Sequence, residues 1–364
     1  MIHLPFRFRS ATRSRAGVPS SEITLPDTSR KVNRVNWILG LVGIAWTGAL
    51  IGCSGASETV TTLGDWVQRS QLEGTSRSGA SSFVVGNIAY MGTGADASNN
   101  RLKDFWAYDP ARNAWTQKAD FGGSARFVGV GFAVGTRGYI GTGIDANSSR
   151  LKDFWEYNPA TNAWRQVADF AGTARQEAVA FAIGNKGYVT TGFDGNYLKD
   201  MWSYDPTANA WAKVASYGGF KRKGAAAFVI NNLAYVGTGS NNNIGQKDWY
   251  VYDPAQGSEG LWTQKLDFTT DQSSSITRTN GIGFAVGTKG YLVTGDGSSS
   301  SRDVWEYDPT TDVWTTRGVF EGAPRSYGVG FAIGNKGYIT TGINGSSRFD
   351  DLWDFDPTVS QVTQ

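Results

Sequence analysis

Two short phrases recur six times along this chain of 364 residues, and they constrain its fold more than any other feature. The first contains Tyr-x-x-Thr-Gly, and the second is close to Asp-x-Trp-x-Tyr-Asp-Pro. The tyrosines of the first phrase are Tyr90, Tyr139, Tyr188, Tyr235, Tyr291 and Tyr338, so the spacing runs from 47 to 56 residues. A nearly constant period of this size predicts a repeat architecture. Residues that recur in register are therefore expected to build the fold before they serve any function.

Each repeat has the pattern of four short antiparallel strands. In the second repeat, turn signals separate apolar or alternating segments at 128–134, 139–142, 153–157 and 163–168. The glycine-containing segment 135–138 suits a tight hairpin, because glycine adopts the positive φ that such turns require.

Side-chain alternation predicts how these strands pack. A period of two places Trp155 and Tyr157 on one face of the third strand and Phe154 on the other. A strand that is apolar on both faces lies between two layers. The small residues of the first strand suit a crowded axis, where four-stranded sheets converge around a central channel.

With these motifs, the chain resembles the kelch-repeat β-propellers. The resemblance rests on four strands per repeat, the Tyr-Asp-Pro…Trp ending and a glycine doublet after the second strand, and it covers about residues 66–357. The doublet is changed here, because threonine replaces its first glycine at Thr93, Thr142, Thr191, Thr238, Thr294 and Thr341. We therefore expect an all-β fold, a six-bladed propeller with four antiparallel strands per blade.

The tryptophans indicate how the ring closes. Five repeats end in a fourth-strand Trp, but the last has Val362 at that position, and Trp66 precedes the first repeat. We expect the N-terminal strand around Trp66 to complete the blade that carries Trp353. Closure of this kind removes the open sheet edges that favour aggregation.

The first 53 residues have a different character and predict an export segment. They hold seven basic and two acidic residues, and the uncharged apolar run 37–51 is short for a membrane-spanning helix. The sequence Leu-Ile-Gly-Cys at residues 50–53 resembles a bacterial lipobox, which implies diacylglycerol attachment at Cys53 and cleavage before it. The alternative is a buried thiol in an uncleaved anchor helix. Residues 1–29 are long and polar for such a signal, so we expect translation to start downstream.

The expected organisation is a removed signal at 1–53, a short tether at 54–64 and the propeller at 65–364. Without 1–53, the chain keeps 27 basic and 30 acidic residues, so its formal charge changes from +2 to −3. The chain without residues 1–53 therefore has no excess of positive charge that would indicate nucleic-acid binding. We expect a monomer in a bacterial cell envelope, with the outer membrane as its location and the N-terminal lipid as its only membrane contact.

Six arginines are the main candidate binding residues: Arg77, Arg126, Arg175, Arg222, Arg278 and Arg325. Each precedes a first strand, so all should lie at one mouth of the channel. The loops between second and third strands reach the same face and end in Asp104, Asp153, Asp200, Asp248, Asp303 and Asp351. One interpretation is a cationic funnel for an anionic glycan or an acidic peptide. The other, which we favour, is six ion pairs that hold the strand ends.

Two further candidates depart from the repeat. The variable loops on this face are rich in Asn, Ser and Gly, typical of solvated turns but also able to bind sugar hydroxyls, with Tyr197 available for stacking. Glu177 lies two residues after Arg175 and occurs in that repeat alone. It is the weak candidate for acid–base chemistry.

The absence of histidine and cysteine after residue 53 limits the reactions that the protein could catalyse. His3 and Cys53 are the only residues of their types and neither follows residue 53, which excludes copper-radical chemistry of the galactose oxidase kind, His-ligated zinc and Ser-His-Asp hydrolysis. We expect no metal and no cofactor. The sequence favours a lipid-anchored binding or scaffolding module for a protein partner or an anionic glycan. The alternative is a metal-independent carbohydrate-active enzyme, such as a sugar epimerase or lyase, with carboxylates at the central channel.

Overall fold

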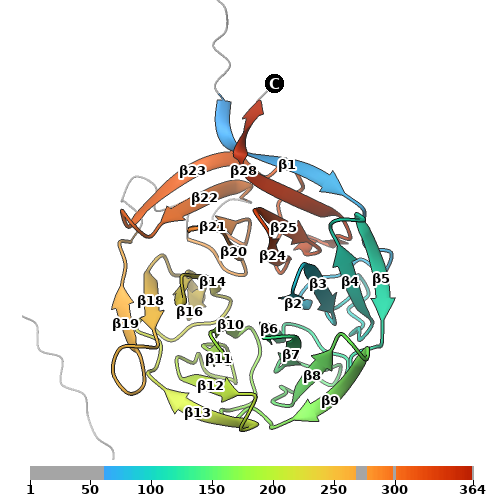
Figure 1. Ribbon diagram of the computed structural model, residues 1–364, viewed down its shortest axis with the longest axis vertical. Helices are drawn as coiled ribbons and strands as arrows, with labels where there is room; N and C mark the ends of the chain where they lie inside the picture. Colours follow the sequence, from blue (N-terminus) through green and yellow to red (C-terminus); the bar gives the residue numbers. More distant parts are fainter. Residues whose placement is uncertain (1–60, 268–276, 298–300, 363–364) are drawn as a thin grey trace, which may run out of the picture. The chain divides into compact units, whose positions relative to one another are not determined.

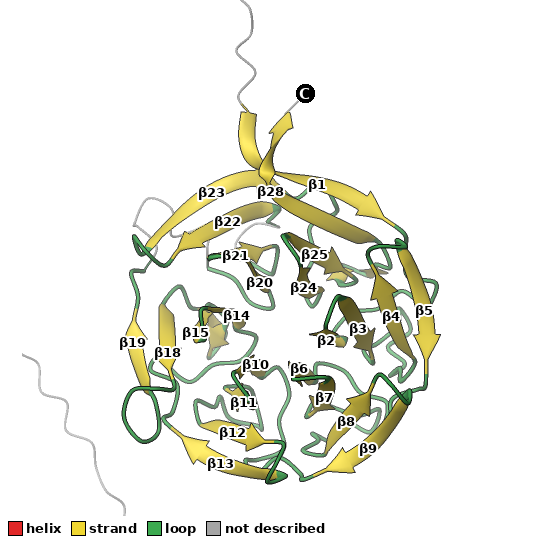
Figure 2. Ribbon diagram, in the orientation of Figure 1, coloured by secondary structure: helices red, strands yellow, loops and turns green. Residues whose placement is uncertain are grey.

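The computed structural model describes residues 61–267, 277–297 and 301–362, and these form six four-stranded antiparallel sheets around a central axis (Figures 1 and 2). The expected six-bladed, all-β propeller is confirmed. Cys53, like the rest of the segment before residue 61, lies outside the described residues. No helix long and apolar enough to cross a bilayer occurs within the described ranges.

The strands of each blade follow one another from the channel outward. Blade 1 contains β2 (Ser81–Val85), β3 (Ile88–Gly92), β4 (Phe105–Asp109) and β5 (Ala114–Lys118). Blade 2 contains β6 (Val130–Val134), β7 (Arg137–Gly141), β8 (Phe154–Asn158) and β9 (Ala163–Val167). Blade 3 contains β10 (Val179–Ile183), β11 (Lys186–Thr190), β12 (Met201–Asp205) and β13 (Ala210–Val214).

The other three blades repeat the plan. Blade 4 contains β14 (Ala226–Ile230), β15 (Leu233–Gly237), β18 (Trp249–Asp253) and β19 (Leu261–Gln264). Blade 5 contains β20 (Ile282–Val286), β21 (Lys289–Val293), β22 (Asp303–Asp308) and β23 (Val313–Val319). Blade 6 contains β24 (Val329–Ile333), β25 (Lys336–Thr340), β28 (Leu352–Val362) and β1 (Thr61–Arg69). Two small hairpins, β16 (Ser240–Asn241) with β17 (Ile244–Gly245) and β26 (Ile343–Asn344) with β27 (Ser347–Arg348), occupy loops between second and third strands.

Blade 2 shows where the expected strand limits shift. Its first strand begins at Val130 and not at residue 128, because Val128 has a φ of 49° and leaves the extended conformation. Its hairpin is tighter than expected: Val134 pairs with Arg137, so Gly135 and Thr136 alone form the turn. Gly135 has a φ of 58°, which glycine adopts without steric cost.

The ring closes through the N-terminal strand, as expected. Strand β1 pairs antiparallel with β28 (Figure 1). The register of this pairing places Trp66 opposite Phe355. The Trp66 side chain is buried, and its ring centroid lies 4.8 Å from those of both Phe320 and Phe355. This strand begins at Thr61, four residues before the propeller boundary expected from the sequence. The first and last strands of the propeller are therefore joined by hydrogen bonds within one sheet.

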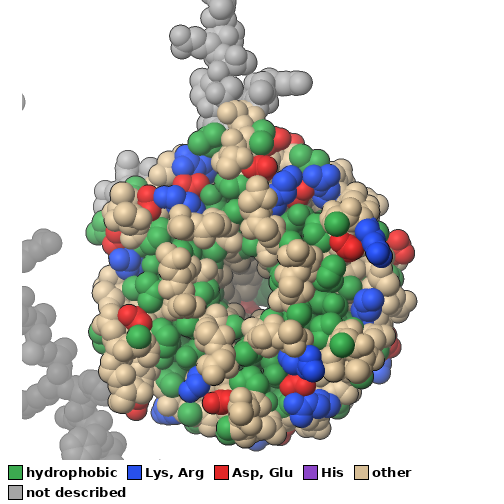
Figure 3. All heavy atoms as spheres, viewed as in Figure 1, with side chains coloured by type: hydrophobic (Ala, Val, Ile, Leu, Met, Phe, Trp, Pro, Cys, Tyr) green, Lys and Arg blue, Asp and Glu red, His purple; other side chains and the backbone are tan. Residues whose placement is uncertain are grey.

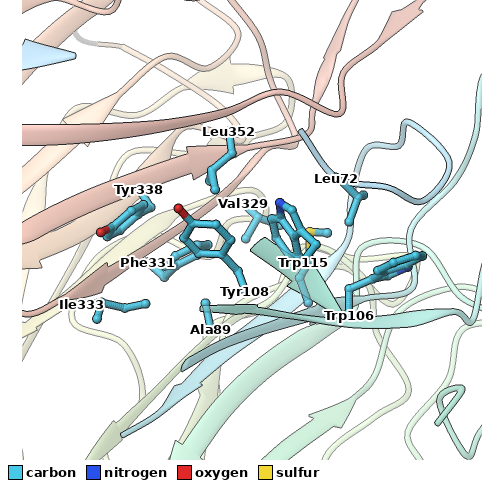
Figure 4. Close-up of a cluster of buried hydrophobic side chains, with 11 residues drawn as sticks. Leu72, Ala89, Trp106, Tyr108, Trp115, Val329, Phe331, Ile333, Tyr338 and Leu352 are labelled. Atoms are coloured by element: carbon cyan, nitrogen blue, oxygen red, sulfur yellow. The ribbon is translucent and has the colours of Figure 1, made fainter. Parts of the chain in front are cut away.

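The core lies between neighbouring blades. Figure 4 shows the cluster between blades 6 and 1, where Phe331 and Tyr338 face Tyr108 and Trp115. The expected alternation holds in blade 2, because Trp155 and Tyr157 pack in the cluster shared with blade 1. Phe154 packs in the cluster shared with blade 3. Each third strand thus contributes apolar side chains to two interfaces.

Candidate functional site: the arginine face and the channel mouth

The loops from the fourth strand of one blade to the first strand of the next leave the propeller on one face. Because antiparallel strands alternate in direction, the loops from second to third strands end on that same face. We call it the arginine face, since it carries the six arginines predicted from the sequence. The tight turns of each blade lie on the opposite face, which we call the hairpin face.

Every arginine of the ring has the aspartate partner that the ion-pair interpretation requires. The pairs are Arg77–Asp104, Arg126–Asp153, Arg175–Asp200, Arg222–Asp248, Arg278–Asp303 and Arg325–Asp351, with N···O distances between 2.5 and 3.3 Å. All six arginine side chains are completely buried, whereas the aspartates keep some exposure. The cationic groups therefore lie beneath the surface of the face.

Arg126 shows how the guanidinium donors of the ring are engaged within the protein. Its Nη2 donates to Asp153 at 2.7 Å, its Nη1 donates to the Thr142 carbonyl at 2.9 Å, and its Nε donates to the Ser124 carbonyl at 3.1 Å. The Phe121 ring lies 4.7 Å from its Cζ, close enough for a cation–π contact. The left-handed φ of 56° at Thr142 accompanies the carbonyl contact to the arginine. Arg126 thus joins three chain segments.

The aspartates have a second partner in most blades. The Trp155 indole N–H donates to Asp153 at 2.7 Å, and Trp106, Trp202 and Trp353 do the same in their blades. Burial alone would raise the pKa of the Asp153 carboxyl, but the hydrogen bond and charge of Arg126, with the indole, lower it. The carboxylate is therefore held in its charged form. Tyr250 replaces the tryptophan in blade 4.

The arginine backbone also joins neighbouring blades. The N–H of Gly143 in blade 2 donates to the carbonyl of Arg175 in blade 3 at 2.8 Å, and this contact recurs at all six junctions. Gly143 has a φ of 94°, and a Cβ there would lie 2.8 Å from a backbone oxygen. The second glycine of the doublet is thus required by geometry. As ligand-binding residues, the six arginines stay a prediction; the contacts described here are those of blade assembly.

A closed ring of backbone hydrogen bonds surrounds the channel mouth just inside the arginines. Its members each lie two residues after a ring arginine: Gly79, Val128, Glu177, Gly224, Asn280 and Tyr327. Each donates its N–H to the carbonyl of the member in the preceding blade, at 2.8 to 3.2 Å, and Gly79 completes the ring by donating to Tyr327. All six have left-handed φ values between 49° and 62°. Such a conformation is costly for a β-branched or bulky residue, so the ring imposes it.

Glu177 is the one carboxylate in this ring, and it lies in a cluster assembled from opposite sides of the mouth. Its side chain is 4% exposed, and its Oε1 accepts from Lys223 Nζ of the next blade at 2.9 Å. The Tyr327 hydroxyl, from blade 6, lies 3.4 Å from Oε2. Burial raises the pKa of the Tyr327 phenol, and the nearby carboxylates of Glu177 and Asp296 raise it further. The cluster places an acid, an amine and a phenol at the channel mouth.

The channel itself is lined by the six first strands. It has a volume of about 510 Å³ and is bordered mainly by the small residues Ala, Gly and Val, as expected for a crowded axis, together with one Phe from each first strand. Figure 3 shows the hollow at the centre of the ring.

Tyr197 in the variable loop of blade 3 already contacts other residues of the protein. The ring of Tyr197, the expected stacking residue, packs on Phe193 at 5.3 Å, and its hydroxyl donates to Asn243 at 3.3 Å. Tyr197 is therefore partly engaged by the loop of the next blade.

Sequence reasoning missed an exposed apolar pair on the arginine face of blade 4. Phe220 is 69% exposed and Ile244 is 68% exposed, and both line a recess of about 720 Å³ that also contains Tyr250. Phe220 lies in the loop before Arg222, and Ile244 lies in the β16–β17 hairpin. Sequence reasoning also missed Lys223 and Tyr327 as neighbours of Glu177. The available signal was that these positions depart from the repeat.

Comparison with known proteins defines the class. A family model described as the KLHDC2/KLHL20/DRC7 Kelch-repeats domain matches residues 61–221 and 124–295. These overlapping matches cover more than half of the chain, which therefore belongs to the kelch-repeat family. Kelch propellers, the class to which the chain belongs, generally act as binding or scaffolding modules.

One similar solved structure, titled "Structure of YjhT", superposes with a TM-score of 0.66 at 19% identity. The match covers 78% of this chain and 96% of that one, and at this identity it shows the fold alone. The comparison with curated proteins found no match.

Proposed function

We propose that this protein is a lipid-anchored binding module of a bacterial cell envelope, and that it docks a protein partner on the arginine face. The observation that carries the proposal is the exposed pair Phe220 and Ile244, which line one recess on that face. Large apolar side chains that are two-thirds exposed and line the same recess are typical of interaction sites. Lys247, Asp248 and Asp267 also line the recess, so the surface combines apolar contact with charged groups of both signs.

A glycan bound directly by the ring arginines fits the geometry less well. Each guanidinium is buried and already donates to an aspartate and to backbone carbonyls, as Arg126 illustrates. A ligand carboxylate would have to displace such a partner, which leaves a buried charge unpaired and is costly. The loop surface outside the ring requires no such exchange.

Site-specific photo-cross-linking in intact cells tests the proposal. A photoreactive residue in place of Phe220 should give a discrete protein adduct, whereas the same residue in place of Val313, 47% exposed at the start of β23, should not. An Ile244→Ser substitution should weaken the adduct at Phe220. Equal labelling at both positions, or none at Phe220, contradicts a docking site there.

The lipid anchor is tested separately. A Cys53→Ser variant of the full chain should move from the membrane fraction to the soluble fraction of disrupted cells, because the acyl chains are the expected attachment. Retention in the membrane fraction would favour an uncleaved anchor helix.

A second candidate function is metal-independent turnover of a sugar, and the Glu177 cluster is the observation that favours it. A buried carboxylate beside a lysine and a tyrosine has the components of acid–base chemistry. Any such activity, followed by NMR of candidate sugars, should fall at least a hundredfold in Glu177→Gln and in Tyr327→Phe. Retained turnover in both variants would assign the cluster a structural role.

A further inference from the structure

A second cluster of charged side chains lies in blade 2 on the hairpin face. It joins Arg137 at the start of β7, Glu156 in the middle of β8 and Arg165 in β9. Arg165 donates from Nε and Nη2 to the two Glu156 oxygens, both at 2.8 Å, and the Tyr139 hydroxyl donates to Oε2 at 2.9 Å. The Arg137 Nε lies 3.7 Å from Oε1. One carboxylate thus stands between two guanidinium groups.

Blade 5 contains the matching cluster, but with its charges balanced. There Arg317 pairs with Glu306 and Tyr291 donates to the same carboxylate, as in blade 2. Lys289, at the position of Arg137, forms its own ion pair with Asp308. Two cations therefore meet two carboxylates.

The difference comes from a single change in the repeated phrase. Five repeats carry Asp before the proline, at Asp109, Asp205, Asp253, Asp308 and Asp356. The second repeat has Asn158 there. Blade 2 therefore lacks the carboxylate that would neutralise Arg137, and its cluster keeps one positive charge in excess.

This unbalanced cluster opens into a pocket of about 610 Å³. Its lining includes Arg137, Arg165 and Asn158, together with Trp164, Thr161 and, from the next blade, Thr207. The Arg137 and Arg165 side chains are 36% and 62% exposed, so both can be reached from solvent. The pocket lies at the opposite end of five-residue strands from the arginine ring, roughly 17 Å away.

We propose that this pocket binds a small carboxylate, such as a uronic acid monosaccharide, through Arg137. Arg165 donates two hydrogen bonds to Glu156, whereas Arg137 lies 3.7 Å from that carboxylate and donates from Nη1 to its neighbour Thr136. Arg137 is therefore the guanidinium that shares Glu156 without a short hydrogen bond to it, and arginine matches carboxylates with two parallel hydrogen bonds. Asn158, Thr161 and Thr207 supply donors and acceptors for hydroxyl groups. This site is separate from the protein-docking face and does not depend on it.

The protonation state of Glu156 agrees with this assignment. Burial would raise the pKa of the Glu156 carboxyl, but the hydrogen bonds from Arg165 and Tyr139 and the charge of Arg137 lower it. Glu156 therefore stays ionised near neutral pH and continues to hold Arg165. The remaining positive charge belongs to Arg137.

Calorimetric titration of the full chain with glucuronate tests the proposal, with glucose as the neutral probe of similar shape and inorganic phosphate as a second anion. We expect saturable glucuronate binding that weakens with added salt, at least tenfold weaker binding of glucose, and weaker binding of phosphate. Asn158→Asp restores the residue of the other five repeats, so it should fold normally and reduce glucuronate affinity at least tenfold. Arg137→Ala should do the same, whereas Lys289→Ala in blade 5 should leave the affinity unchanged.

Three results would overturn the assignment. Glucuronate that fails to bind at about 10 mM removes the site. Glucose or phosphate that binds as tightly as glucuronate shows that a carboxylate is not what the pocket selects. Unchanged affinity in both Asn158→Asp and Arg137→Ala, with unchanged melting temperatures, places the bound molecule elsewhere.

Discussion

Removal of a single ring aspartate should show what an arginine pair contributes to this fold. Asp153→Ala leaves the completely buried Arg126 without its counter-ion, with two backbone carbonyls and the Phe121 ring as remaining partners. Breaking one partner of a buried ion pair costs about 3–5 kcal/mol. Asp153 is itself 23% exposed, so water can partly solvate the uncovered charge, and we expect the lower end of that range, about 3 kcal/mol.

Urea unfolding of the full chain, followed by circular dichroism, measures this change. The midpoint should fall while the denaturant slope stays the same, because the surface exposed on unfolding is unchanged. Arg112→Ala is the control. It breaks a surface pair with Asp109 in which Arg112 is 83% exposed, and such pairs contribute roughly 0–1 kcal/mol.

A double variant tests whether the loss comes from the pair itself. Arg126→Met combined with Asp153→Ala removes both charges, so its cost should be smaller than the sum of the single costs by at least about 1 kcal/mol. Additive costs, or a loss below about 1 kcal/mol in Asp153→Ala, would refute the view that the pair holds the blade. The arginines would then be better explained by ligand binding.

Three further predictions concern other parts of the fold. Trp66→Ala removes the aromatic anchor of ring closure and should lower the free energy of unfolding by about 3–5 kcal/mol, measured by urea denaturation; an unchanged midpoint would contradict closure by β1. Burial would raise the pKa of the Asp104 carboxyl, but the hydrogen bond and charge of Arg77 lower it below its ordinary value of 3.8. The pair therefore stabilises the folded state fully at neutral pH, and this stabilisation is lost as the pH falls below 3.8. The free energy of unfolding, measured from pH 7 to 2.5, should therefore fall more steeply in the wild type than in Asp104→Asn. Equal slopes would show that this ion pair does not contribute to the pH dependence. Gly138→Ala would place a Cβ 2.0 Å from the Phe83 ring and should lower the melting temperature through a loss of about 1–3 kcal/mol, whereas a neutral effect would show that the blade interface can yield.

The sequence was sufficient to predict the propeller because a propeller is a local structure repeated. Strand alternation, turn residues and the tryptophan at the end of each repeat all lie within about 50 residues. The strands pair with their sequence neighbours in every blade except the last, so strand order along the chain was enough to predict the pairing. The exception, Trp66 with β28, was predictable from Val362 at the missing tryptophan position.

The candidate sites were predictable only as far as they repeat. The arginines and aspartates share a register, so their meeting on one face followed from topology, and the structure then showed them buried and paired. The partners of Glu177 do not share its repeat. Lys223 comes from the next blade, and Tyr327 comes from a blade 150 residues away.

By itself, the sequence determined the number of blades, the closing strand and the face on which the arginines lie, because each of these depends on local periodicity and strand direction. Tertiary structure alone decided which charges are balanced. Asn158 differs from the aspartates of the other repeats by one group, and its consequence appears only where Arg137, Glu156 and Arg165 meet from three strands. Charge balance depends on distances between strands, and a linear pattern carries no such distances.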